Sequence, residues 1–318
     1  MHTIREKIYS HYIKDINERS ISKRSEDFEK FIQNIPQYMA KVNVNLIRES
    51  EGYQVKTYKE LVRCVAELGY LNPQFNLLYR GQDKDYKGDT GSIIYPSIFR
   101  PEYRKTLTTT EIQERFKSLE KIHMKLLSEK RKIFLEKILL SYPEYYYALI
   151  QHYEKSLTPL IDLTQSLRVA ATFAIRKDIS GYVLVFGMPH PHGSISHFID
   201  QEMVLVKLQN VCPPNSLRPH YQEGYLAGNF PFKEVRQSGD NLARRLIGKY
   251  YLDNSDNHFW DKGFSRIPEE ALFPKNDPFQ KELNEILKKE LSNNIFPTGK
   301  INETSGKIGE SAKILDFF

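Results

Sequence analysis

Residues 151–174 constrain the fold more than any other stretch, because a short apolar segment is followed at once by an apolar helical pattern. Residues 158–163 predict a short buried strand. Asp162 and Thr164 lie where this strand turns into a helix, whose inner face recurs at three- and four-residue spacing: Ser166, Val169, Ala170, Phe173 and Ala174. A carboxylate and a hydroxyl there can cap the first turn of the helix, but the same free amides can hold an anionic ligand instead. Capping alone explains Asp162, so a ligand site needs support from elsewhere in the chain.

Helical and extended patterns alternate along the rest of the chain. Strands are predicted at 75–79, 158–163, 181–187 and 203–208, with an extended stretch at 92–99 and a turn followed by a strand at 218–230. Helices are predicted at 4–16, 28–35, 57–69, 110–140, 145–150, 241–251 and 276–291. Two helix starts carry specific signals, a capping box at Thr57 and Glu60 and a cap at Asp277 followed by Pro278.

This mixture predicts an α+β fold, in which a helical N-terminal part precedes a mixed, largely antiparallel sheet core with flanking helices. The predicted domains are a helical N-terminal region over 1–56, an α+β domain over 57–275, and a C-terminal helix and tail over 276–318. A chain of 318 residues with 40% hydrophobic residues is long enough for one large core or two smaller ones.

Composition narrows the class of protein. No run approaches eighteen apolar residues and the first residues lack the features of a signal peptide, so we expect a cytoplasmic protein without a membrane span. Cys64 and Cys212 are the only cysteines, too few for a disulfide framework or a four-cysteine zinc site. The net charge of +6 permits an anionic partner. However, the densest basic stretch, 117–137, is interrupted by glutamates, which favours an ordinary solvated helix face.

A second polar feature stands at the end of the predicted strand 75–79. Arg80 places a fixed positive charge there, and Gly81 allows a ligand to approach the backbone closely. The planar fork of arginine suits phosphate or carboxylate. A structural ion pair beside a turn glycine explains the pair equally simply, so this tripeptide is a weak signal by itself.

Two further clusters contain groups suited to acid–base or ligand chemistry. His152 and Tyr153 precede the predicted strand, and a histidine of near-neutral pKa can act as acid or base or position a hydroxyl; a half-buried histidine satisfied by backbone is the alternative. Downstream, Arg218 is followed by Gln222 and Glu223, which can bring an amide or a carboxylate to a ligand, although a charged loop explains them nearly as well.

Metal and nucleotide motifs are otherwise lacking in the sequence. His190, His192 and His197 are candidate metal ligands, but no cysteine or nearby carboxylate completes a set, so no metal is expected. There is no phosphate loop ending in Gly-Lys-Ser or Gly-Lys-Thr, no Gly-x-Ser-x-Gly and no dinucleotide glycine fingerprint.

Taken together, these clusters resemble the FRG-domain family, found in bacteria and their phages, over roughly residues 57–230. The resemblance rests on the order of the motifs: Tyr79-Arg80-Gly81-Gln82, Tyr95-Pro96-Ser97-Ile98-Phe99-Arg100, His152-Tyr153, Thr158 to Thr164, Val169 to Ala174, then Arg218, Gln222 and Gly224. The chain departs from the family pattern at Tyr79 for Phe, Glu154 for Gly, Pro159 for Arg and Leu163 for Trp.

The motif layout is also similar to that of the ADP-ribosyltransferase fold, and this second resemblance implies a substrate and a site. The substrate implied is nicotinamide adenine dinucleotide (NAD). The resemblance implies a binding role for Arg80, Gly81, Tyr153, Asp162, Thr164 and Arg218, and a catalytic role for Glu223, Gln222 and His152. Within this set Arg80 would anchor the dinucleotide, the Thr164 hydroxyl would shape the nicotinamide pocket, and Glu223 or Gln222 would be the late polar group.

Two functional hypotheses follow. The first is an enzyme that transfers ADP-ribose from NAD to a nucleic acid or protein, or hydrolyses NAD, in a bacterial toxin or phage-defence setting. The second is a module that binds a nucleotide or nucleic acid without turnover, which Pro159 at the family's arginine position and the basic composition favour.

Overall fold

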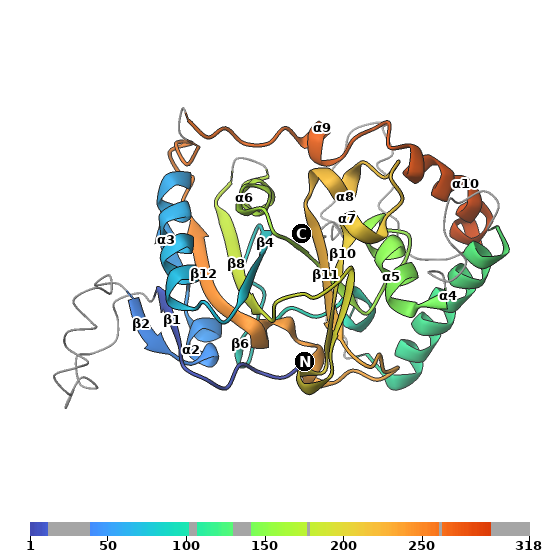
Figure 1. The fold of residues 1–318 in the computed structure, drawn as a ribbon, viewed down its shortest axis with the longest axis horizontal. Helices are drawn as coiled ribbons and strands as arrows, with labels where there is room; N and C mark the ends of the chain where they lie inside the picture. The colour runs from blue at the N-terminus through green and yellow to red at the C-terminus, as the bar shows by residue number, and fades with distance from the viewer. Residues whose placement is uncertain (12–38, 102–106, 130–140, 177–178, 261–262, 294–318) are drawn as a thin grey trace, which may run out of the picture.

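An eight-stranded mixed sheet organises the computed structural model, which describes residues 1–11, 39–101, 107–129, 141–176, 179–260 and 263–293 (Figure 1). Its strands lie in the order β3 (Tyr53–Val55), β12 (Leu246–Leu252), β8 (Gly181–Met188), β4 (Asn76–Gln82), β7 (Leu160–Thr164), β11 (Gly224–Asn229), β10 (Met203–Lys207) and β9 (Ile195–Phe198). Neighbouring strands are antiparallel except β12 and β3, which run parallel. The predicted α+β class with a mixed, largely antiparallel sheet is confirmed.

The remaining elements surround this sheet. Two small antiparallel pairs are formed by β1 (Ile8–His11) with β2 (Met39–Val42) and by β5 (Lys87–Gly88) with β6 (Gly91–Ser92). The α-helices are α2 (Val44–Glu49), α3 (Tyr58–Leu71), α4 (Thr109–Ser128), α5 (Pro143–His152), α6 (Leu167–Ala174), α7 (Leu208–Val211), α8 (Arg218–Tyr221), α9 (Glu269–Leu272) and α10 (Pro278–Asn293). Short 3-10 turns cover Ser97–Phe99, Ile199–Gln201, Ser238–Asp240 and Leu242–Arg245.

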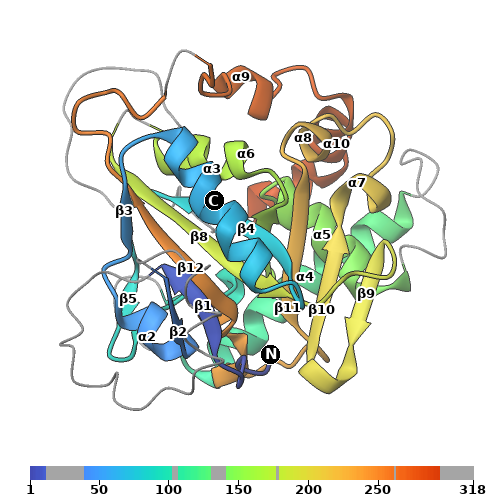
Figure 2. The same cartoon turned by 60° about the vertical axis from the view of Figure 1, so that its left-hand side comes forward.

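Two apolar clusters stabilise the two ends of the molecule. One contains buried residues of α2, α3, β8 and β12, and the other contains those of α4, α5 and α10 together with Val204 and Val206 of β10. Figures 1 and 2 show α3 at one end of the sheet, α4, α5 and α10 at the other, and α6 between them. Helix α6 packs on β4 and β8, so it lies over the middle of the sheet.

The middle of the sheet is joined by a single residue pair. Only Tyr79 of β4 and Thr164 of β7 are partners in register, whereas β4 pairs with β8, and β7 with β11, along their whole lengths. Beyond this pair the β7 backbone has no partner in β4, and a buried carbonyl there needs a side-chain donor instead. This joint lies where the sequence placed its strongest polar signals.

Most predicted elements of the central region are confirmed, with boundaries within a few residues. The strands at 75–79, 158–163, 181–187 and 203–208 correspond to β4, β7, β8 and β10, and the strand within 218–230 is β11. The Thr57 hydroxyl accepts from the Glu60 amide at 3.1 Å, as in a capping box, although the Glu60 carboxylate accepts from Lys56 N rather than from Thr57 N. The Asp277 carboxylate caps α10 by accepting from Gln280 N at 3.1 Å.

Two predicted helices are wrong where the structure describes them. Ile8–His11, within the predicted helix 4–16, is strand β1, because its backbone pairs with β2. The predicted helix 241–251 is a 3-10 turn followed by β12. Five consecutive residues of β12, 246–250, are buried, so both faces of the strand are covered. A short helix can produce the same continuous apolar pattern. The predicted helix 28–35 and the part of the predicted helix 110–140 beyond residue 129 lie outside the described residues.

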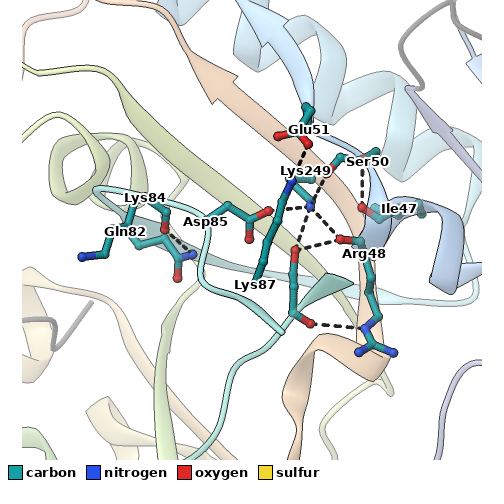
Figure 3. A network of polar contacts seen from close by, with 10 residues as sticks. Ile47, Arg48, Ser50, Glu51, Gln82, Lys84, Asp85, Lys87 and Lys249 are labelled. Atoms are coloured by element: carbon teal, nitrogen blue, oxygen red, sulfur yellow. Dashed lines mark hydrogen bonds and ion pairs between the residues drawn. The ribbon is translucent and has the colours of Figure 1, made fainter. Parts of the chain in front are cut away.

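A buried ammonium group connects β12 to the elements beside it (Figure 3). Lys249 Nζ lies within hydrogen-bonding distance of four oxygens: Arg48 O (2.9 Å), Ser50 O (2.6 Å), Asp85 Oδ2 (2.8 Å) and Ser92 Oγ (2.7 Å). The side chains of Lys249 and Asp85 are both almost fully buried. Burial lowers the pKa of Lys249, and the Asp85 carboxylate opposes that shift.

Replacing Lys249 with Met is expected to lower the free energy of unfolding by about 3 kcal/mol, because it leaves the buried Asp85 carboxylate without its cation. Lys87→Ala is the matched control from the same network, since Lys87 pairs with the exposed Glu51 and an exposed pair contributes about 0.5 kcal/mol. Urea denaturation of both variants measures the difference. Equal losses would show that the Lys249 cluster contributes no more than a surface ion pair.

Candidate functional site

Arg80 lies at the joint between β4 and β7 and is only 4% exposed. Its Nη1 donates to the Asp162 carbonyl oxygen at 3.0 Å, which provides the side-chain donor that the β7 backbone needs beyond the paired residues. The strand-end arginine and the kink residues, about eighty positions apart in the sequence, are therefore brought into direct contact.

The Asp162 side chain belongs to a buried polar cluster and does not cap a helix. Gln151 Nε2 donates to its Oδ2, and His152 Nδ1 lies 3.7 Å from its Oδ1. Helix α6 begins shortly after β7 ends, and its N-cap, Ser166, makes no side-chain capping bond. The capping interpretation of Asp162 is therefore wrong, because a residue in the middle of a strand cannot reach the first turn. Thr164 comes closer to that role, since its Oγ1 accepts from Ser166 N at 3.0 Å.

Two members of this cluster received no role from the sequence. Gln151 bridges the site, because its amide donates to Asp162 while its Oε1 accepts from the Thr158 hydroxyl. Arg100 donates to the Tyr95 carbonyl oxygen at 2.6 Å, and its pKa is lowered by burial and by the neighbouring charge of Arg80. Both residues lie within or beside the motifs that carry the family resemblance, and that position is the only sequence signal for them.

Burial and neighbouring groups set the charge states at Asp162 and His152. Burial by itself would raise the pKa of the Asp162 carboxyl, but the adjacent His152 and Gln151 and the charge of Arg80 together hold it below its usual range. Burial lowers the pKa of His152, and although Asp162 opposes this, the shift stays downward. The site therefore combines an ionised carboxylate with a neutral imidazole, whose two nitrogens make no hydrogen bond within the described residues.

The stability of the protein is expected to fall as the pH is lowered from about 7 to about 5. The pKa of His152 is lower in the folded protein than in the unfolded chain. As the pH falls through the pKa of the unfolded chain, the unfolded state therefore binds a proton that the folded state does not, and stability present at neutral pH is lost. His152→Gln is expected to reduce this slope, and His11 and the Met1 α-amino group, whose pKa values are also lowered by burial, contribute to the remainder. Urea denaturation across this pH range tests the expectation, which a flat profile would contradict.

Thr164 connects this cluster to the segment before β11. Its hydroxyl donates to the Gln222 carbonyl oxygen at 2.7 Å, and both residues are fully buried. Glu223 follows with a positive φ of 47° and is half-buried, with its carboxylate accepting from Gln165 Nε2 at 3.3 Å. Thr164 and the Gln222–Glu223 pair therefore meet where β7 ends and β11 begins, and Arg80 bonds β7 two residues before Thr164. Glu223 is the member that solvent reaches.

Gly81 has a packing role that the sequence did not indicate. A Cβ added at Gly81 would lie 1.9 Å from the Ala170 carbonyl oxygen of α6. The group that approaches the Gly81 backbone closely is therefore α6, and not the ligand that the sequence suggested.

A strap formed by residues 265–277, which includes α9, runs beside α6 and α8 (Figure 1). Several polar contacts hold it. Among them are the Arg168 guanidinium on the Ser265 carbonyl oxygen (2.9 and 2.6 Å), Arg176 on Glu269 (2.5 Å), and the Gln222 amide on the Leu272 carbonyl oxygen (2.8 Å). The buried side chain of Gln222 is thus bonded to the strap.

The far end of the strap is anchored by Asp277 and Phe273. Asp277 Oδ2 accepts from the Tyr153 hydroxyl and from Arg218 N, each at 3.0 Å. The Arg218 guanidinium lies 4.7 Å from the centre of the Phe273 ring and pairs with Glu154. Tyr153 and Arg218, both predicted to bind ligand, therefore lie against the strap and the start of α10. They share none of the partners described for Arg80.

A hollow of about 310 Å³ opens beside this end of the strap. Its lining includes three cationic side chains, Arg218, Lys275 and Lys281, together with Phe273 and Gln280. Positive charge beside an aromatic ring suits the phosphate and base of a nucleotide.

Two of the three histidines considered as metal ligands, His192 and His197, have separate surroundings. His197 Nε2 lies 2.8 Å from Glu144 Oε1, and His192 packs against the Phe198 ring. The one group of potential metal ligands found within the described ranges lies elsewhere, at His11, Cys64 and Glu67.

Comparison with known proteins identifies one family. The FRG domain family matches residues 75–181, a span that contains Arg80, Gly81, His152, Asp162 and Thr164, whereas Arg218, Gln222 and Glu223 follow it. No curated protein and no solved structure matched the chain. In the described part of the chain no helix is long and apolar enough to cross a membrane. The chain therefore carries an FRG domain from the start of β4 to the start of β8.

Proposed function

We propose that the FRG domain and the segment before β11 form an NAD-binding site that breaks the nicotinamide–ribose bond. The ADP-ribose is then transferred to a nucleic acid or protein acceptor, or to water, in a bacterial toxin or phage-defence setting. The observation that carries the proposal is that three neighbouring strands are linked by two side-chain hydrogen bonds, from Arg80 of β4 to Asp162 O of β7 and from Thr164 at the end of β7 to Gln222 O just before β11.

The proposed chemistry needs little covalent participation by the protein. The C–N bond to nicotinamide breaks, its electron pair leaves with neutral nicotinamide, and the ribose becomes oxocarbenium-like. The acceptor or water then forms the new bond at the same carbon and loses a proton. The Glu223 carboxylate would stabilise the developing positive charge, and the Arg80 cation would favour the phosphates.

Access to this site depends on the strap. Arg80, Thr164 and Gln222 are all at most 4% exposed, so a dinucleotide reaches them only after a conformational change, and we propose that residues 265–277, which bond the Gln222 side chain, are the segment that moves. Arg168 and Arg176 hold the outer side of the strap through Ser265 and Glu269, and both contacts face solvent. Weakening these contacts should therefore open the site without removing any group that would bind the dinucleotide.

The test compares wild type with an Arg168→Ala/Arg176→Ala variant for nicotinamide release from NAD and for thermal stabilisation by NAD. We expect release by both proteins and a several-fold faster rate in the variant. Arg63→Ala, which removes an exposed arginine on α3, is the matched control and should behave as wild type. The proposal is wrong if neither wild type nor the opened variant releases nicotinamide or is stabilised by NAD.

The second candidate is a nucleotide- or nucleic-acid-binding module without turnover. The cationic hollow lined by Arg218, Lys275 and Lys281 favours it, as does the net charge of +6. This function predicts binding of an oligonucleotide that weakens steeply with added salt, with no nicotinamide release. Loss of that binding in Lys275→Ala/Lys281→Ala would place the nucleic acid in the hollow.

A further inference from the structure

Three side chains with metal-binding groups meet where β1 lies beside α3 (Figures 1 and 2). His11 comes from β1, while Cys64 and Glu67 lie three positions apart on α3, so they share one face of the helix. One ligand atom from each residue lies within 4.8 Å of the others. None of the three received a functional role from the motifs.

We propose that His11, Cys64 and Glu67 bind a divalent transition metal of the zinc type. Imidazole nitrogen, thiolate sulfur and carboxylate oxygen are all zinc ligands, and three protein ligands leave a fourth tetrahedral position for water. Metal–ligand bonds of about 2.0–2.3 Å bring ligand atoms closer together than 4.8 Å, so the side chains would contract around the ion by small rotations.

The surroundings of His11 are those of a metal ligand. Burial lowers the pKa of His11, which favours the neutral imidazole that a metal needs. Its Nδ1 lies 2.9 Å from the hydroxyl oxygen of the buried Tyr250, and its Nε2 lies 3.1 Å from Glu67 Oε2. A hydrogen bond from Nδ1–H to Tyr250 fixes the ring and leaves Nε2 directed at the candidate site, which is the usual outer-shell arrangement for a ligating histidine.

The charge balance also fits a divalent ion. A Cys64 thiolate and a Glu67 carboxylate would neutralise the two charges of the metal in a mostly buried location, and the exposed Arg63, 4.0 Å from Glu67 Oε1, adds a positive charge at its edge. Binding of the metal would displace the thiol proton of Cys64, whose side chain is fully buried beside His11 and Glu67. Bound metal would connect β1 to α3 and stabilise the folded chain, independently of the nucleotide site.

The competing arrangement is a hydrogen-bonded cluster without metal, in which His11 bridges Tyr250 and Glu67 and the Cys64 thiol only fills space. Titration of metal-free, full-length protein with Co²⁺ distinguishes the two, because a cobalt–thiolate bond gives a near-ultraviolet charge-transfer band. Wild type is expected to show the band at one equivalent, with Zn²⁺ displacing Co²⁺ and raising the melting temperature. Cys212→Ser removes the other buried cysteine and should retain all three responses.

Cys64→Ser should lose the band and the stabilisation by Zn²⁺. Glu67→Gln, at a half-buried position, provides a second variant that keeps the thiolate band but binds at least about tenfold more weakly. Circular dichroism confirms that each variant is folded. A wild-type protein that binds no Co²⁺ stoichiometrically, or a band that persists in Cys64→Ser, would overturn the proposal in favour of the hydrogen-bonded cluster.

Discussion

Glu223→Gln is expected to lower the rate of nicotinamide release by about a hundredfold while changing NAD affinity little. The amide has nearly the same shape as the carboxylate but lacks the negative charge that stabilises an oxocarbenium-like ribose. Glu223 is the half-exposed member of the candidate site, at a left-handed backbone position before β11, so the substitution leaves the buried contacts of Thr164 and Gln222 in place. Single-turnover release of nicotinamide, with affinity measured separately, gives both quantities.

Glu202→Gln is the matched control for this prediction. Glu202 has the same kind of backbone, with a φ of 49°, and makes an exposed ion pair with His2 just before β10. Its substitution should leave nicotinamide release unchanged. An active protein in which Glu223→Gln and Glu202→Gln behave alike would remove Glu223 from the mechanism and leave Gln222 as the late polar group.

Gly81→Ala is expected to have the largest effect on folding, a loss of about 3 kcal/mol or more in the free energy of unfolding. The added Cβ would lie 1.9 Å from the Ala170 carbonyl oxygen and 2.8 Å from Ala174 N, and both are backbone atoms of α6 that no side-chain rotation can move away. Helix and strand would have to separate at the centre of the sheet, beside Arg80. Urea denaturation at neutral pH measures the loss.

Gly193→Ala provides the comparison, because the nearest neighbour of an added Cβ at Gly193, the Ile195 carbonyl oxygen, is 3.6 Å away, an ordinary contact distance. The free energy of unfolding of this variant should lie within about 0.5 kcal/mol of the wild-type value. Equal stability of the two variants would mean that α6 does not pack closely on β4. Separating the two effects matters for function, since a Gly81 variant that loses nucleotide binding by unfolding says nothing about ligand contacts.

The parts of the fold that the sequence predicted well are those with strong local signals. Strands β4, β7, β8 and β10 are short, apolar and bounded by turns, and α3 and α10 begin with capping residues. Strand β12 was mistaken for a helix because residues buried on both faces lose the alternation that marks a strand. Strand β1 was mistaken because its partner, β2, is distant in the sequence.

The candidate site divides in the same way. Sequence motifs alone identified Arg80, His152, Asp162, Thr164, Gln222 and Glu223 as the residues to examine, because chemically suited groups stand at predicted strand ends in a family-specific order. They could not reveal that Asp162 binds Gln151 within a buried cluster, or that Tyr153 and Arg218 face the strap. Those relations depend on which strands become neighbours.

The residues that the sequence could not identify at all are those that act through long-range contacts. Before its last residue, the predicted cap Asp277, the strap 265–277 carries no motif, yet it reaches α6, Gln222 and the start of α10. His11 and Cys64, far apart in the sequence, meet only because β1 packs against α3. The stretch 151–174 by itself determined a strand, a helix and a polar turn between them, because these depend on neighbouring residues. Only the tertiary structure decided that Asp162 faces a buried cluster and that a strap bonds the Gln222 side chain, because the pairing of distant strands determines what each side chain meets.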